Sequence, residues 1–188
     1  MHFLNLRTTT TNFIKRNLIY TRSYSSVHTT SRSLTSCEEL HHQIQQPKWY
    51  QKLRIIDARC DMVEHDFFAL HMEKRISGSK FFSFDECCDQ STSLPFMLPS
   101  SKDFSSYVTR LGISNEHHVV VYDHHELVGA LYSPRVWWMF RAFGHGKVSI
   151  LDGGFGKWLS DGYPTVLGPY SEQESLPSKQ FLFFSCKN

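Results

Sequence analysis

HVVVYD at residues 118–123 is the stretch that decides the fold, because three consecutive valines followed by an aromatic residue predict a buried β-strand. SPRVWWMFR follows at 133–141 and predicts a helix, with Ser133 as N-cap, proline at the first helical position and Gly144 just beyond the end. VSIL at 148–151 predicts the next strand. A strand, a helix and a second strand in this order predict two parallel strands joined by a right-handed crossover.

The same alternation extends toward the N-terminus. Ser36 and Glu39 fit a capping box, and the predicted strand at 53–58 is followed by further helical and strand-like patterns. The other predicted strands are Leu53–Ala58 and Phe81–Phe84. Helices are predicted from Ser36 to about Gln45, through Phe67, Phe68 and His71, and around Lys157–Ser160. A further helix is predicted to begin after Ser100 or Ser101, with its apolar face formed by Phe104, Tyr107, Val108 and Leu111. We therefore expect a three-layer α/β domain, with a central parallel sheet flanked by helices.

Acidic residues follow the predicted strands. Asp57, Asp85, Asp123 and Asp152 each lie at or just after the end of one. Parallel sheets place their chemistry at the carboxyl ends of the strands. This edge is therefore where a functional site is expected, although Asp57 and Asp152 also suit the capping of turns or helices.

The first 36 residues differ in charge from the rest of the chain. They contain five Lys and Arg residues and no Asp or Glu, so this segment has a charge of +5. Because the whole chain has a net charge of +2, the remaining residues have a net charge of −3. A segment rich in Arg, Ser and Thr and free of acid is typical of a mitochondrial presequence. We expect residues 1–34 to be a disordered presequence, cleaved near Ser25, for import into the mitochondrial matrix; a disordered basic tail is the alternative.

Composition excludes several classes of protein. The 188 residues are 40% hydrophobic, which is too apolar for a wholly disordered chain, and no apolar run could form a transmembrane segment. A net negative main part without a basic patch argues against nucleic-acid binding. The five cysteines include no Cys-x-x-Cys pair, and the adjacent histidine pairs are interpreted as surface residues, so neither a metal nor a cofactor is predicted.

Specific motifs resemble a known family. LGIS at 111–114, the 118–123 strand, the 133–141 helix and LDGG at 151–154 with Trp158 look like the amino-terminal domain of the tandem-domain rhodaneses, the thiosulfate and 3-mercaptopyruvate sulfurtransferases. Asp57-Ala58-Arg59 begins the resemblance, which covers about 35–166. It implies sulfane sulfur transfer from thiosulfate or 3-mercaptopyruvate to cyanide or a thiol, through a cysteine persulfide.

The resemblance also implies where that cysteine would be. It would follow the 118–122 strand, at a loop whose N–H groups stabilise a thiolate and an anionic donor, but Asp123 occupies this place. The family's first domain is likewise noncatalytic. Asp85 and Arg59 are the remaining candidates for polar groups on the substrate side or at a domain interface, and a structural role is favoured for both. Phe96, where the mercaptopyruvate enzymes often carry a histidine, slightly favours thiosulfate as donor.

We therefore expect a presequence at 1–34, a rhodanese domain at 35–166 and a tail at 167–188 that is a truncated interdomain linker or an aberrant C-terminus, in an incomplete or alternatively spliced form. No catalytic residue is assigned, and the domain alone is expected to be inactive. In a full enzyme its partner is a small-molecule sulfur donor.

Other interpretations remain open. The chain could be a noncatalytic interaction module that binds a protein through the uncovered domain face, as an exposed aromatic cluster at 181–184 would suggest. Cys60 and Cys87 are interpreted as incidental or buried thiols. The aromatic residues at 137–140 are interpreted as core, with Arg135 and Arg141 paired or stacked on their rings.

Overall fold

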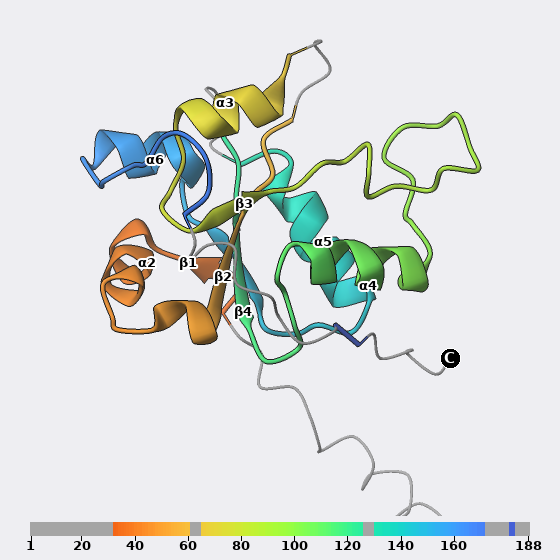
Figure 1. The fold of residues 1–188 in the computed structure, drawn as a ribbon, viewed down its shortest axis with the longest axis horizontal. Helices are drawn as coiled ribbons and strands as arrows, with labels where there is room; N and C mark the ends of the chain where they lie inside the picture. Colours follow the sequence, from red (N-terminus) through yellow and green to blue (C-terminus); the bar gives the residue numbers. More distant parts are fainter. Residues whose placement is uncertain (1–31, 61–64, 126–129, 172–180, 183–188) are drawn as a thin grey trace, which may run out of the picture.

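The computed structural model describes residues 32–60, 65–125, 130–171 and 181–182. Within them, strands alternate with helices (Figure 1). The strands are β1 (Leu34–Thr35), β2 (Leu53–Asp57), β3 (Ser79–Phe81), β4 (His118–Tyr122) and β5 (Val148–Leu151), and the helices are α2 (Cys37–Ile44), η1 (Trp49–Gln51), α3 (Phe67–Glu73), α4 (Ser101–Arg110), α5 (Ser133–Ala142) and α6 (Gly154–Ser160). No helix of the described residues is long and apolar enough to cross a membrane.

The five strands form one parallel sheet in the order β1-β5-β4-β2-β3. β4 and β2 lie at its centre, with Ile55 opposite Val120 and Asp57 opposite Tyr122. Since all strands point the same way, their carboxyl ends share one edge. The predicted α/β fold with a central parallel sheet is confirmed.

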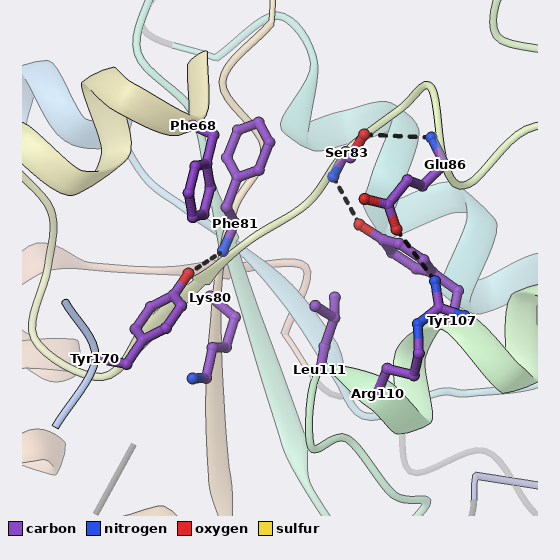
Figure 2. A pocket seen from close by; sticks show the side chains of 9 residues that line it. All are labelled: Phe68, Lys80, Phe81, Ser83, Glu86, Tyr107, Arg110, Leu111 and Tyr170. Atoms are coloured by element: carbon purple, nitrogen blue, oxygen red, sulfur yellow. Dashed lines mark hydrogen bonds and ion pairs between the residues drawn. The ribbon is translucent and has the colours of Figure 1, made fainter. Parts of the chain in front are cut away.

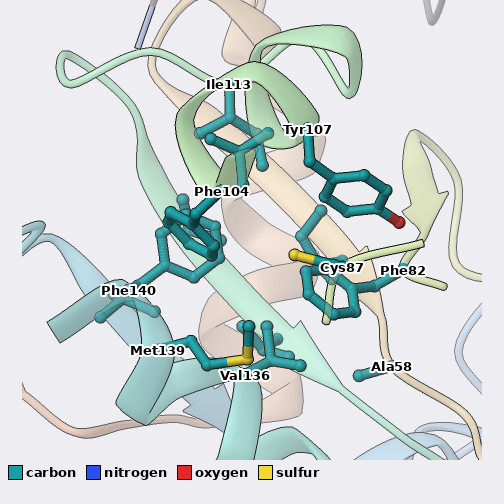
Figure 3. Close-up of a cluster of buried hydrophobic side chains, with 14 of the residues drawn as sticks. Ala58, Phe82, Cys87, Phe104, Tyr107, Ile113, Val136, Met139 and Phe140 are labelled. Atoms are coloured by element: carbon teal, nitrogen blue, oxygen red, sulfur yellow. The ribbon is translucent and has the colours of Figure 1, made fainter. Parts of the chain in front are cut away.

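Alternate residues of the central strands face opposite layers. Val119 and Val121 of β4 pack into the cluster formed by α4 and α5, shown in Figure 3 with Phe104, Val136 and Phe140. On the other face, Val120 and Tyr122 pack against α2 and α6, whose contributions include Leu40, Phe155 and Trp158. The two apolar layers explain why β4 reads as a continuous apolar run.

Most of the predicted elements are confirmed, and three differ: the short helix η1, which was not predicted, the third strand and β1. The third strand ends at Phe81, where the predicted one begins, because only Ser79–Phe81 pair with β2; Phe82 and Phe84 are buried beyond the strand. β1 was not predicted. It has two residues and pairs with the edge of β5.

The segment after α6 packs against the domain. Val166 pairs with Arg75 in an antiparallel bridge, and the Gly168 N–H donates to the Met72 carbonyl (2.7 Å). Phe181 is fully buried between Phe104 and Phe140, so its predicted exposure was wrong. Leu182 is exposed, and the rest of the 181–184 cluster lies outside the described residues.

Candidate functional site at the carboxyl edge of the sheet

Asp123 lies directly after β4 and caps the start of helix α5. Its Oδ2 accepts hydrogen bonds from the backbone N–H groups of Leu131 (2.8 Å), Tyr132 and Ser133 (2.7 Å). The first N–H groups of a helix have no partner within the helix, and convergent N–H groups at that end bind anions. Here the anion is a carboxylate of the same chain.

This arrangement corrects the predicted cap of α5. The N-cap is Tyr132, without a side-chain hydrogen bond, and Ser133 is the first helical residue. Asp123 instead accepts the N–H groups of the two residues before the helix and of its first residue. Pro134 lies in the first turn, as predicted.

Two opposed effects act on the Asp123 carboxyl group. Burial raises its pKa, and the hydrogen bonds from the loop and the start of α5 lower it; the net pKa is above the usual value. The carboxyl is 1% exposed, so it cannot exchange its partners for water without movement of the chain.

A second carboxylate, Asp57, lies at the end of the neighbouring strand β2. It is completely buried and receives Arg59 Nη2 (2.6 Å), Arg59 Nε (2.9 Å), His71 Nδ1 (2.7 Å) and the Tyr122 hydroxyl (3.0 Å) at Oδ2. Its other oxygen accepts the Arg59 N–H (3.2 Å), so the expected turn-capping role is one part of a larger network. A buried ion pair of this kind holds elements in register because neither charge can be left unpartnered.

His71 extends this network from α3 to the segment after α6. Its Nε2 lies 3.0 Å from the Tyr170 hydroxyl, which also accepts the Phe81 N–H (3.3 Å). Burial lowers the pKa of His71, even though the hydrogen bond to Asp57 opposes this shift. In the neutral imidazole that results, Nδ1–H donates to Asp57 and Nε2 accepts from Tyr170.

Burial alone would raise the pKa of Asp57, but the hydrogen bond from His71 and the charge and hydrogen bonds of Arg59 outweigh it and lower the pKa. Asp57 also raises the pKa of Arg59 against the effect of burial. The guanidinium donates to the Lys74 carbonyl (2.8 Å) and lies 5.1 Å over the Phe155 ring. The Arg59 charge is therefore neutralised within the domain.

A surface pocket of about 240 Å³ lies beside this network (Figure 2). Lys80 Nζ is 3.5 Å from the centre of the Tyr170 ring, and the Tyr107 hydroxyl accepts the Ser83 N–H (2.7 Å). Across the pocket Arg110 pairs with Glu86 (3.1 Å). Its polar groups are thus engaged with one another and single out no ligand.

The sequence of this chain is similar to those of known proteins. The family model for the rhodanese-like domain matches residues 36–161. The chain belongs to the rhodanese-like domain family. Thiosulfate sulfurtransferase of Gallus gallus is 44% identical over 146 residues, 77% of this chain and 50% of the relative, and 3-mercaptopyruvate sulfurtransferase of Rattus norvegicus is 40% identical over 139 residues, 73% and 46%.

The fold comparison agrees with the family. The crystal structure of SseA from Escherichia coli, a 3-mercaptopyruvate sulfotransferase with the rhodanese fold, matches with a TM-score of 0.68 and 28% identity, covering 84% of this chain and 56% of that one. The chain spans about half the length of the curated relatives it matches.

In this rhodanese domain the two polar candidates from the sequence lie in different surroundings. Arg59 is buried on Asp57. Asp85 lies on an exposed loop, where its backbone carbonyl accepts Gln90 Nε2 (2.7 Å) and Cys88 Sγ (3.3 Å). Arg59 is held in place by its ion pair with Asp57 and by the Lys74 carbonyl. His71 and Tyr170, which complete the Asp57 network, were missed because they are distant in sequence; the Asp-x-Arg spacing was the one local signal.

The described cysteines of the rhodanese domain include two with strongly raised pKa values. Burial raises the pKa of Cys37 to about 11 and that of Cys87 to about 12, so both stay protonated at neutral pH. Cys60 is half-buried, and Cys186 lies outside the described residues. Thiolates are the nucleophilic form, so neither Cys37 nor Cys87 has the environment of a sulfur carrier.

The structure also tests the predictions for the aromatic residues of α5 and for the adjacent histidines. Arg135 lies over the Trp138 ring (5.0 Å) and Arg141 over the Trp137 ring (5.5 Å), so the predicted stacking is confirmed. The prediction that Trp138 belongs to the core was wrong: this side chain is 44% exposed, because it faces away from the sheet with Arg135. The surface interpretation was wrong for His117, which is buried and accepts the Ser114 N–H (2.9 Å). Among the described residues, no group of three or more His, Cys, Asp or Glu could hold a metal ion.

Proposed function

We propose that this chain is a noncatalytic rhodanese domain of a sulfurtransferase, and that it transfers no sulfur by itself. The reaction of the whole protein would take sulfane sulfur from thiosulfate or 3-mercaptopyruvate and deliver it to cyanide or a thiol. Family membership and the names of the relatives support the reaction class.

The observation that carries the proposal is the position of the Asp123 carboxylate. Sulfur transfer of this kind needs a thiolate beside N–H groups that stabilise the charged persulfide and the anionic donor. The N–H groups after β4 are engaged by Asp123. A carboxylate carries no sulfane sulfur, and its charge opposes the approach of a second anion.

The environments of the cysteines agree with this proposal. Cys87, the thiol that follows β3, is buried in the α4–α5 layer with its pKa raised to about 12. Cys60, which follows β2, packs at the margin of the same apolar cluster.

The domain would instead contribute a rigid edge. Asp57, Arg59 and Tyr122 tie the ends of the two central strands together. In a tandem protein such an edge supports a neighbouring catalytic domain and excludes water from its site. We also propose import into the mitochondrial matrix, on the acid-free composition of residues 1–34; N-terminal sequencing of the protein from isolated organelles tests this, and an intact Met1 would contradict it.

The decisive experiment is an assay of the purified chain. Thiocyanate formed from thiosulfate and cyanide, and pyruvate formed from 3-mercaptopyruvate with a thiol acceptor, are measured beside the Gallus gallus thiosulfate sulfurtransferase as positive control. We expect no turnover above the buffer rate. Turnover that disappears in Cys60→Ser or Cys87→Ser would overturn the proposal and identify the sulfur carrier.

A further inference from the structure

Phe181 places its side chain in an apolar pocket between two helices of the domain. The centre of its fully buried ring lies 6.0 Å from that of Phe104 in α4 and 6.2 Å from that of Phe140 in α5; both partners are labelled in Figure 3. The His145 ring lies 5.3 Å away. The next side chain, Leu182, is 59% exposed. The pocket therefore takes a single aromatic ring from the stretch 181–182, which is dark blue in Figure 1.

Two hydroxyl groups one turn apart on α4 bind the main chain of Phe181. The Phe181 N–H donates to Thr109 Oγ1 (3.0 Å), and the Ser105 hydroxyl donates to the Phe181 carbonyl. Thr109 gives its own hydroxyl proton to the Ser105 carbonyl (2.8 Å), so its oxygen serves as the acceptor. Because residues i and i+4 share one face of a helix, both hydroxyl groups meet the same residue.

Asn115, in the loop between α4 and β4, binds both main-chain groups of the next residue. The Leu182 N–H donates to Asn115 Oδ1 (2.6 Å), and Asn115 Nδ2 donates to the Leu182 carbonyl (2.6 Å). A side-chain amide carries a donor and an acceptor, so it pairs with an extended residue as a neighbouring strand would. The exposed Leu182 side chain takes no part in these contacts.

All four main-chain polar groups of residues 181 and 182 are thus bound by side chains of the domain. Main-chain hydrogen bonds give affinity for an extended segment, and a pocket for one side chain gives specificity. A helix face that only completed a core would present apolar side chains. The buried Ser105 and the Thr109 hydroxyl instead suit a segment whose N–H and carbonyl groups need partners.

We propose that this surface is a peptide-binding site for an extended segment with one aromatic residue, and that residues 181–182 of the same chain are its exchangeable occupant. We call it the aromatic-segment site; it consists of Ser105, Thr109, Asn115 and the pocket that receives Phe181. The residue after the aromatic one cannot be proline, because proline has no N–H for Asn115. The site does not depend on the proposed function, since none of its residues lies at the carboxyl edge of the sheet.

A peptide added to a chain that lacks the Phe181 ring tests the site. The probe is an amidated peptide with the sequence of residues 177–182, Pro-Ser-Lys-Gln-Phe-Leu, labelled with fluorescein at its N-terminus. Fluorescence anisotropy measures its binding. We expect saturable binding to the full-length Phe181→Ala variant. Binding to wild type should be at least about tenfold weaker, because there the tethered segment occupies the site.

Altered peptides separate the individual contacts. Phe181→Ala in the peptide should abolish saturable binding, because the pocket loses its ring. Leu182→Pro in the peptide removes the N–H that Asn115 accepts and should weaken binding at least about tenfold. Leu182→Ala in the peptide is the matched control and should change the Kd by less than about twofold, because this side chain is exposed.

A second change in the protein tests Asn115 directly. Asn115→Asp, added to Phe181→Ala, keeps the shape of the side chain and replaces the donor to the Leu182 carbonyl with an oxygen. We expect the parent peptide to bind this double variant at least about tenfold more weakly than it binds Phe181→Ala.

Each result supports or overturns the site. A folded Phe181→Ala variant that binds no peptide, or that binds the alanine peptide as tightly as the parent, would overturn it. If Phe181→Ala is unfolded alone, recovery of its far-UV circular dichroism on addition of the parent peptide supports the site, and no recovery overturns it. Wild-type dimers in light scattering that Phe181→Ala abolishes would place the segment of a second copy in the site, against the assignment to the same chain.

Hydrogen exchange in wild type tests whether the segment is separable without any variant. Protection factors of the Phe181 and Leu182 amides are measured by NMR beside that of Val120, which is fully buried in β4. We expect the amides of 181 and 182 to be protected at least about tenfold less than Val120, because the segment can leave while the sheet stays folded. Equal protection of Phe181 and Val120 would mean that the segment separates only when the whole domain unfolds, and would overturn the proposal.

Discussion

Replacement of Asp57 by asparagine is expected to be the most destabilising isosteric change in the carboxyl edge of the sheet. Asparagine keeps the shape of the side chain and removes its charge, while Arg59 remains 7% exposed with its guanidinium between β2 and α3. One carboxylate oxygen becomes an NH₂ group that faces other donors, because the acceptor sites of Asp57 bind Arg59, His71 and Tyr122.

The magnitude follows from the burial of the pair. Breaking a buried ion pair by removing one partner costs about 3 to 5 kcal/mol, mainly because the other charge is left uncompensated. For a domain of this size the Tm should fall by about 6 to 20 °C. Since a typical domain is stable by only about 5 to 15 kcal/mol, Asp57→Asn brings the protein close to unfolding.

Urea unfolding at pH 7, followed by tryptophan fluorescence, measures this effect. Asp85→Asn is the matched control, because Asp85 is exposed and an exposed substitution changes the unfolding free energy by less than about 0.5 kcal/mol. The double variant Asp57→Asn with Arg59→Met removes both charges, so its loss should be smaller than the sum of the single losses. A cost for Asp57→Asn below about 1 kcal/mol, or additive losses in the double variant, would refute the role of the pair.

The same variant has a defined pH dependence. The pKa of Asp57 is lowered in the folded state, mainly by His71 and Arg59 against the effect of burial. A carboxyl group with a lowered folded-state pKa stabilises the protein above its unfolded pKa of about 3.9, and the stabilisation is lost as pH falls through the folded value. The difference between wild type and Asp57→Asn should therefore be constant near neutrality and shrink below about pH 4.

Three further changes test other parts of the fold. Gly78→Ala should lower the unfolding free energy by about 2 to 4 kcal/mol in urea titration, because Gly78 has φ +77° and an added Cβ would lie 2.2 Å from the Trp49 ring. Phe181→Ala should cost about 3 to 5 kcal/mol by the same assay, whereas Leu182→Ala, an exposed neighbour, should cost little; equal effects would contradict the buried position of Phe181. Burial lowers the pKa of His145 to about 4, so between pH 6.5 and 4 the unfolded state binds a proton at this residue and the folded state does not. Wild type therefore loses stability as the pH falls through this range. His145→Gln should reduce this dependence of the unfolding free energy on pH by about 1.4 kcal/mol per pH unit, as measured by urea unfolding at several pH values.

Sequence patterns predicted the parts of the fold that depend on local periodicity and caps. The strand at 118–122 and the capping by Ser36 are confirmed because a run of buried valines and a serine three residues before an available N–H are local features. β1 escaped prediction because its two residues carry no periodicity, and their pairing with β5 is a long-range contact.

The site was predictable in position but not in its connections. The pattern placed Asp57 and Asp123 at the carboxyl edge, where both lie. It could not show that His71 and Tyr170, which are 99 residues apart, meet across a hydrogen bond. Nor did it show that Asp123 would cap α5 in place of a serine, since that depends on how the chain returns to the end of β4.

The two buried carboxylates at this edge are linked through a short physical path. Tyr122 donates to Asp57 and immediately precedes Asp123, whose backbone carbonyl accepts the Phe155 N–H (2.8 Å). The Phe155 ring in turn lies beneath the Arg59 guanidinium that neutralises Asp57. Each carboxylate thus accepts hydrogen bonds from donors of its own chain, and a change at one should be felt at the other, because packed neighbours that share partners rarely behave additively. An edge whose charges are engaged in this way is suited to hold its shape, which is the property that a noncatalytic rhodanese domain would contribute.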